Sequence, residues 1–148
     1  MLRKWTVLGG TLAAVTALTV GISMADDDEG PLHQLMEKVQ KHNAVITKGA
    51  RTAVNYKKAQ KEVFASAEEL VKLAKEAKPL KDGIKKAKGL ADAQGKWDKY
   101  MDDFEKSSAA LAKVAASPKS NNEEAKKAHG VVKAACAACH KDFKVEDE

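Results

Sequence analysis

The chain has 148 residues, of which 26 are lysine or arginine and 21 are aspartate or glutamate, so its formal net charge is +5. Only 5% of the residues are aromatic, and the abundance of alanine, lysine and glutamate favours helices. Arg3 and Arg51 are the two arginines, and no basic segment carries interleaved aromatic residues. The composition therefore argues against nucleic-acid binding.

Residues 1–25 have the pattern of a secretory signal peptide. A positively charged start is followed by an apolar stretch over residues 7–22 and by a small-x-small processing site that ends at Ala25. Cleavage after Ala25 would leave residues 26–148 as one small periplasmic domain, without stable membrane insertion. The alternative is an uncleaved N-terminal membrane anchor facing the periplasm, because the apolar stretch approaches bilayer-spanning length.

Four amphipathic helices are predicted in residues 26–148, because apolar residues recur there at spacings of three and four. We expect them over residues 31–48, 57–78, 96–116 and 120–144. The expected inward positions are, in chain order, Leu32, Leu35, Met36, Val39, Asn43 and Ile46; Val63, Phe64, Ala67, Leu70, Val71 and Ala74; Trp97, Tyr100, Met101, Phe104, Ser108 and Leu111; and Ala128, Val132, Ala135, Cys139 and Phe143. With no strand-like alternation, the predicted fold is all-α, an up-and-down antiparallel four-helix bundle.

Local signals mark the ends of these helices. Pro31 is expected at the first helical position and Gly49 as the stop of the first helix, and Pro79 ends the second. Residues 79–96, interrupted by glycines and rich in lysine, are expected to form a long exposed connection with one helical turn at most. The segment 120–123 fits a capping box at the start of the last helix.

The string Cys136-Ala137-Ala138-Cys139-His140 contains both cysteines of the chain and has the spacing of a covalent haem attachment site. Each cysteine can form a thioether with a haem vinyl group, and the adjacent histidine can ligate the iron. A thioredoxin-like site would need a βαβ context, and a zinc site would need further clustered ligands; neither is found. A disulfide across so short a loop would stabilise the chain little.

A haem string on the last of four helices in an exported chain resembles the class II c-type cytochromes, that is, cytochrome c′ and its low-spin relatives of the cytochrome c556 kind. The continuation Lys141-Asp142-Phe143-Lys144 is similar to the family's ending, in which an aromatic and a basic residue follow the haem histidine. The resemblance implies one covalently attached haem c per chain on the last helix. It makes Cys136 and Cys139 the thioether positions and His140 the proximal iron ligand.

The family also places a first-helix residue on the other side of the iron, and Met36 is the candidate here. Low-spin members carry an arginine one turn before this methionine, where this chain has Leu32. The alternative for Met36 is ordinary core packing. His33 and His42 flank it and are expected at the surface. His129 lies three turns before His140 and cannot reach the same iron.

Further residues leave two interpretations open. Trp97, Tyr100 and Phe104 could wall the haem pocket or pack as an ordinary core, and Met101 is expected in the core. The lysines of residues 78–96 could dock an acidic redox partner or line a solvated connection. The resemblance is compatible with a homodimer through the first two helices.

The function predicted from these patterns is electron transfer by a periplasmic mono-haem cytochrome with redox partner proteins, and not enzymatic catalysis. No paired carboxylates in an apolar setting and no phosphate-binding glycine loop are apparent in the sequence. The alternative is a five-coordinate cytochrome c′-type protein whose open distal site binds nitric oxide or carbon monoxide. A third hypothesis is a haem-free helical redox or metal protein.

Overall fold

The computed structural model describes residues 30–87 and 89–143, and the predicted signal peptide lies outside these ranges. Within them all regular secondary structure is helical. The helices are α1 (Pro31–Ala50), α2 (Ala53–Ala77), α3 (Asp82–Lys86), α4 (Ala93–Ala116) and α5 (Asn122–Phe143). The predicted all-α class is therefore confirmed for the described part of the chain.

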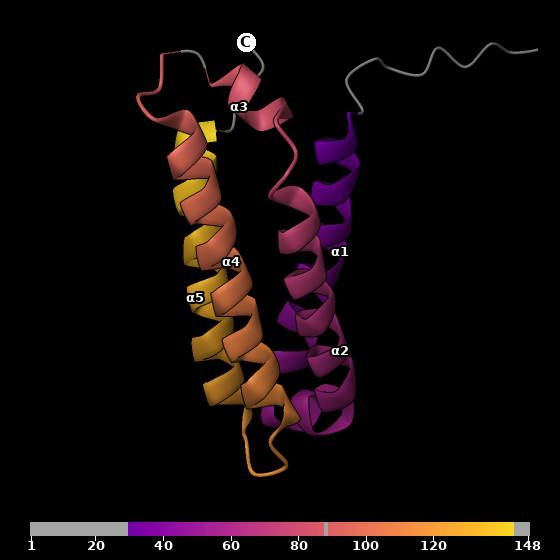
Figure 1. Ribbon diagram of the computed structural model, residues 1–148. Helices are drawn as coiled ribbons and strands as arrows, with labels where there is room; N and C mark the ends of the chain where they lie inside the picture. Colours follow the sequence, from indigo (N-terminus) through magenta and orange to yellow (C-terminus); the bar gives the residue numbers. More distant parts are fainter. Residues whose placement is uncertain (1–29, 88, 144–148) are drawn as a thin grey trace, which may run out of the picture.

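The four long helices lie side by side, and consecutive ones run in opposite directions (Figure 1). The short helix α3 lies in the connection between α2 and α4, at the end of the molecule where α1 begins and α5 ends (Figure 1). Helix α1 packs against α2, α2 against α4, and α4 against α5, whereas α1 and α5 share far fewer contacts. The side between α1 and α5 is thus the loosest of the arrangement.

Two helices begin earlier than predicted because a polar residue caps them. The Thr52 hydroxyl accepts a hydrogen bond from the Asn55 N–H at 3.1 Å, so α2 begins at Ala53 and not near residue 57. The Asp92 carboxylate accepts from the Gly95 N–H at 3.2 Å, and α4 begins at Ala93.

Gly49 is not the stop that its residue type suggested. It lies inside α1, which continues to Ala50, and it is buried. A Cβ atom at this position would lie 2.6 Å from Cγ2 of Val63, closer than real Cβ contacts come. Gly49 therefore serves the close approach of α1 and α2.

The capping box of α5 lies one residue later than the segment 120–123 predicted. The Asn121 side chain accepts from the Glu124 N–H at 3.0 Å, and the Glu124 carboxylate accepts from the Asn121 N–H at 3.0 Å. The Ser120 hydroxyl instead donates to the Ser117 carbonyl at 2.8 Å. It also lies 2.9 Å from the Tyr56 hydroxyl, which ties the α4–α5 connection to α2.

Most of the predicted inward positions form one apolar core, whose largest fully buried side chain is Trp97. Phe64 is the one predicted inward residue that is exposed, at 36%, and Leu73 is buried on α2 although it was not predicted to be. Among the residues that the structure describes, no helix combines the length and apolarity needed to cross a bilayer.

Candidate functional site

Helix α5 carries the paired cysteines and the adjacent histidine in its last two turns. Cys136 and Cys139 are three residues apart, one helical turn, and both are free thiols. Cys139 is buried, Cys136 is half-buried and His140 is exposed. All three side chains nevertheless border the same cavity.

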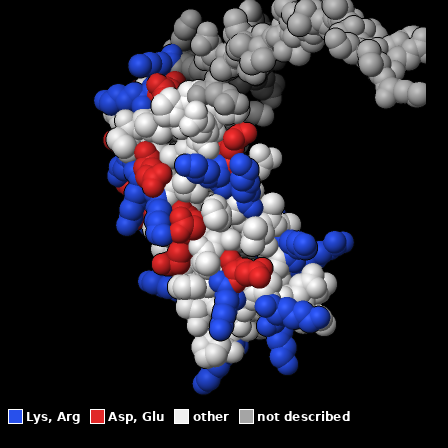
Figure 2. Space-filling view, turned by 90° about the vertical axis from the view of Figure 1, so that its right-hand side faces the viewer, with Lys and Arg blue, Asp and Glu red and all other residues white. Residues whose placement is uncertain are grey.

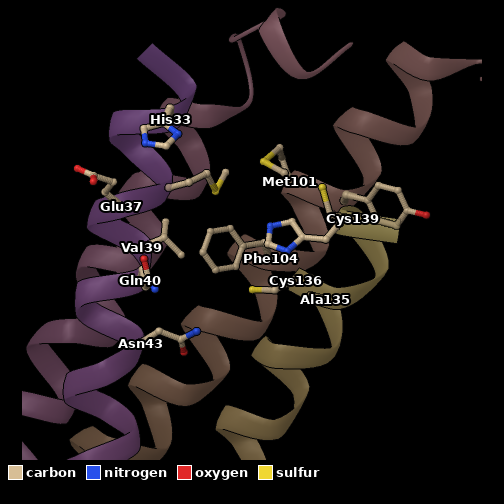
Figure 3. A pocket seen from close by; sticks show the side chains of 13 residues that line it. His33, Glu37, Val39, Gln40, Asn43, Met101, Phe104, Ala135, Cys136 and Cys139 are labelled. Carbon is tan, nitrogen blue, oxygen red and sulfur yellow. The ribbon is translucent and has the colours of Figure 1, made fainter. Parts of the chain in front are cut away.

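This cavity has a volume of about 410 Å³, within the range typical of cofactor and small-molecule sites. It lies among α1, α4 and α5, where the contacts between α1 and α5 are sparse. In Figure 3 the cysteine sulfurs face it from α5, across from Val39 and Asn43 on α1. Its lining residues are His33, Met36, Glu37, Val39, Gln40, Asn43, Tyr100, Met101, Phe104, Ala135, Cys136, Cys139 and His140.

Met36 lies on the α1 wall of the cavity, as the sequence predicted. It is half-buried and packs against the apolar core. The cavity therefore brings the predicted candidate of α1 together with the three predicted residues of α5, although more than 90 residues separate them in the chain. His33 also reaches the cavity wall but is exposed, and His42 is half-buried and does not line the cavity.

The structure shows which of the α4 residues line the cavity and which pack only in the core. Tyr100 and Phe104 line the cavity, and Met101, expected in the core, both lines it and is buried. Trp97 does not line it: its ring meets Phe143 edge-on at 5.2 Å, and its indole N–H donates to the Lys78 carbonyl at 3.0 Å.

A polar contact fixes the end of α5 next to the cysteines. The Tyr100 hydroxyl donates to the Asp142 carboxylate at 2.9 Å, and the Lys96 ammonium lies 3.3 Å from the same oxygen. The hydrogen bonds from Tyr100 and Lys96 lower the pKa of Asp142, while Asp142 raises the pKa of Tyr100. This contact holds the turn that carries Cys139 and His140 against α4.

The electrostatic surroundings of the two cysteines disfavour a thioredoxin-like role. Burial raises the pKa of Cys139 to about 12, with the neighbouring Cys136 and Asp142 adding to the effect. Burial also raises the pKa of Cys136. A redox-active cysteine pair relies on a lowered pKa, because the thiolate is the nucleophile. Here both groups are neutral thiols near pH 7.

A polar pair formed by the buried His129 and the half-buried Asn43, at one end of the cavity, was not predicted from the sequence. His129 is only 4% exposed, and its Nε2 lies at hydrogen-bonding distance from Oδ1 of Asn43, which lines the cavity. Burial lowers the pKa of His129 to about 4, and the charge of Lys133 contributes. His129 precedes Cys136 by seven residues, a spacing that places both on one face of α5. This spacing was the sequence pattern from which the inward position of His129 could have been predicted.

A haem fits the residues that border this cavity. The two thiols face a half-open cavity with largely apolar walls, an imidazole follows them on the same helix, and a thioether lies on the α1 wall. In the described ranges, no three His, Cys, Asp or Glu side chains cluster so as to hold a metal ion by themselves. Comparison with protein-family models, with curated proteins and with solved structures gave no match to this chain.

Proposed function

We propose that this chain is a mono-haem c-type cytochrome of the class II kind, an up-and-down four-helix bundle that carries one haem c on α5 and transfers electrons. The observation that supports this most directly is the shared cavity: Cys136, Cys139 and His140 border it from α5, and Met36 borders it from α1. The proposal requires no general acid, base or nucleophile, since no substrate is transformed.

The α5 residues would bind the haem in three places. Cys136 and Cys139 would hold the haem through two thioethers, each S–H having added across one vinyl group so that the sulfur bonds one carbon and the hydrogen goes to the other. His140 supplies the imidazole ligand. When bound, the haem supplies iron that cycles between the ferrous and ferric states by one electron. The contact of Asp142 with Tyr100 keeps this end of α5 in place.

Met36 would hold the other side of the iron in the electron carrier. A thioether ligand favours the ferrous state and raises the reduction potential. The flanking positions Leu35 and Val39 are buried, which fixes the rotation of α1 that turns Met36 toward the cavity. With both Met36 and His140 bound, the iron would need little rearrangement on electron transfer.

A second candidate function is binding of a small neutral gas, nitric oxide or carbon monoxide, at a five-coordinate iron. The apolar cavity wall formed by Val39, Met101 and Phe104 favours it, because such a wall would accommodate a neutral diatomic molecule. This function follows if the Met36 sulfur leaves the iron open.

The proposed location is the periplasm, after export by residues 1–25, and the proposed partners are other redox proteins of an electron-transfer chain. The lysines of the α2–α4 connection are a weak candidate for a docking surface. Lys78 pairs with Asp102 at 2.6 Å, and Lys85 lies 3.9 Å from Asp82. Acidic and basic side chains are also interspersed on the face shown in Figure 2. A homodimer through α1 and α2 is compatible with the resemblance.

The test is a visible spectrum of the ferrous protein from a host that matures c-type cytochromes, recorded with and without carbon monoxide. Sharp split bands unaffected by carbon monoxide are expected for the electron carrier. In Met36→Ala we expect conversion to a broad high-spin spectrum and carbon monoxide binding. Met101→Leu is the matched control, because Met101 is a second methionine on the same cavity and should leave the spin state unchanged.

Each other result has a definite meaning. A spin state that does not respond to Met36→Ala makes Met36 a packing residue, and a high-spin wild type that binds carbon monoxide favours the gas-binding function. A pyridine haemochrome assay without haem, together with a mass equal to that of the bare chain, would leave a haem-free helical protein and refute the proposal.

A further inference from the structure

We infer that the amide of Asn43, held in place by His129, donates a hydrogen bond into the cavity to a carboxylate of the haem. The inference rests on the proposed function, because it concerns the same cavity and the same cofactor. It adds a polar anchoring residue from α1 to the two covalent attachments on α5.

The geometry of the His129–Asn43 pair leaves the amide nitrogen of Asn43 available to the cavity. Oδ1 of Asn43 accepts from Nε2–H of His129, across the contact between α1 and α5. The Asn43 side chain lines the cavity, and Figure 3 shows its amide group directed toward the interior from α1. An amide has two N–H donors, and both stay on the nitrogen when the oxygen is engaged.

His129 makes this orientation stable over a wide pH range. The ring is buried, and a buried histidine disfavours the charged form. With a pKa of about 4, His129 is neutral at physiological pH, so one ring nitrogen carries a proton and can donate to Oδ1 of Asn43. A partner of this kind fixes a binding side chain in one orientation, as outer-shell partners do at metal sites.

The position of Asn43 along α1 limits which part of a haem its side chain could contact. It lies seven residues after Met36 on α1, roughly 10 Å along the helix axis at about 1.5 Å per residue. It is therefore too far along α1 to contact an iron bound by Met36, and it would lie level with the rim of a haem held at that iron. The two carboxylates are the strong hydrogen-bond acceptors on a haem rim.

Other polar groups on the cavity wall are less suited to this role. The Tyr100 hydroxyl donates to Asp142, Glu37 would repel a carboxylate, and Gln40 and His33 are exposed. A carboxylate drawn into a largely apolar cavity needs a donor, because burying a charge without a partner is costly. Asn43 is half-buried and has a fixed orientation.

The experiment measures the midpoint potential of the haem-loaded protein between pH 5 and 9, where an ionising carboxylate produces a change of slope. A hydrogen bond to the charged form lowers a carboxyl pKa, so Asn43→Leu should raise the pH of that change by about one unit. Asn43→Asp keeps an acceptor for His129 but puts a negative charge in place of the donor. It should raise the pH at which the slope changes by at least as much as Asn43→Leu does.

The matched control is Gln40→Leu, which removes an amide from the same wall and the same helix and should leave the change of slope at its wild-type pH. If Asn43→Leu does not fold, Asn43→Asp decides the question. Haem-loaded variants of Asn43 with the wild-type pH profile would overturn the inference and leave the proposed function intact. A wild-type protein without haem would refute the proposed function itself.

Discussion

The burial of His129 was not predicted from its position in the sequence. Its burial disfavours the imidazolium, so the folded protein binds a proton there only near pH 4, whereas an unfolded chain binds one near pH 6.5. The contribution to stability is therefore complete above about pH 6.5 and is lost as the pH falls toward 4.

We expect the free energy of unfolding to fall by about 2 kcal/mol over this interval through His129 alone. The measurement is denaturant unfolding at pH 7 and pH 4.5 for the wild type and for His129→Gln, in which this part of the pH dependence should disappear. The exposed His33 provides the control: His33→Gln should retain the wild-type pH dependence. An unchanged pH dependence in His129→Gln would contradict the assigned burial.

The cavity brings together the residues that the sequence singled out, and their role in holding a haem stays a prediction. Cys136, Cys139 and His140 were singled out by their spacing, and Met36 by the family resemblance together with its place on an apolar stripe. Asn43 was predicted inward, but His129, which forms a hydrogen bond with its side-chain oxygen, lies on another helix. A hydrophobic pattern cannot pair a polar residue with its hydrogen-bond partner on another helix, because the pairing depends on how the two helices are rotated against each other.

At the level of the helices, the close approach of α1 and α2 depends on Gly49. A methyl group there would meet Val63 at 2.6 Å, and Val63 is fully buried and cannot move away freely. We expect Gly49→Ala to destabilise the protein by about 1–3 kcal/mol, as overpacking of a core does.

Gly130 of α5 is the matched control for this prediction, because it is also a helical glycine but a Cβ there would have no atom within 4 Å. Gly130→Ala should be neutral or stabilise the protein by up to about 1 kcal/mol through helix propensity. Thermal unfolding of both variants is the measurement. Equal effects of the two substitutions would show that the contact with Val63 is unimportant.

Helix boundaries could be predicted where a local sequence signal determines them. They could not be predicted where tertiary contacts determine them. Pro31 begins α1 as expected. Glycine is a common residue at a helix end, but α1 continues through Gly49 because a glycine is needed there for the close contact with α2. At the start of α5 the capping box shifted by one residue, since Ser120 is engaged by Tyr56 and by the connection that precedes it. Such choices depend on residues far away in the sequence.

At the level of the whole molecule, the proposed haem should hold together the side where α1 and α5 meet. Cys136→Ser combined with Cys139→Ser removes both thioether positions and would leave the cavity without its covalently held occupant. We expect amides of α1 and of the last turns of α5 to exchange with solvent about tenfold faster or more, because their opening becomes easier.

Hydrogen exchange followed by mass spectrometry measures this effect peptide by peptide. Peptides from α2 and α4, which pack most extensively against each other, serve as the internal reference and should change least. A uniform increase over all four long helices would contradict a local role of the cavity.

The sparse contact between α1 and α5 has a mechanical consequence. Coordination of the iron from both residue 36 and residue 140 would close nearly the entire domain into a single loop, as an intramolecular cross-link does. Because thioether coordination favours the ferrous state, that cross-link would be tighter after the protein has accepted an electron. The first helix would then be stiffer in the reduced protein than in the oxidised one, and a partner touching it could sense the difference.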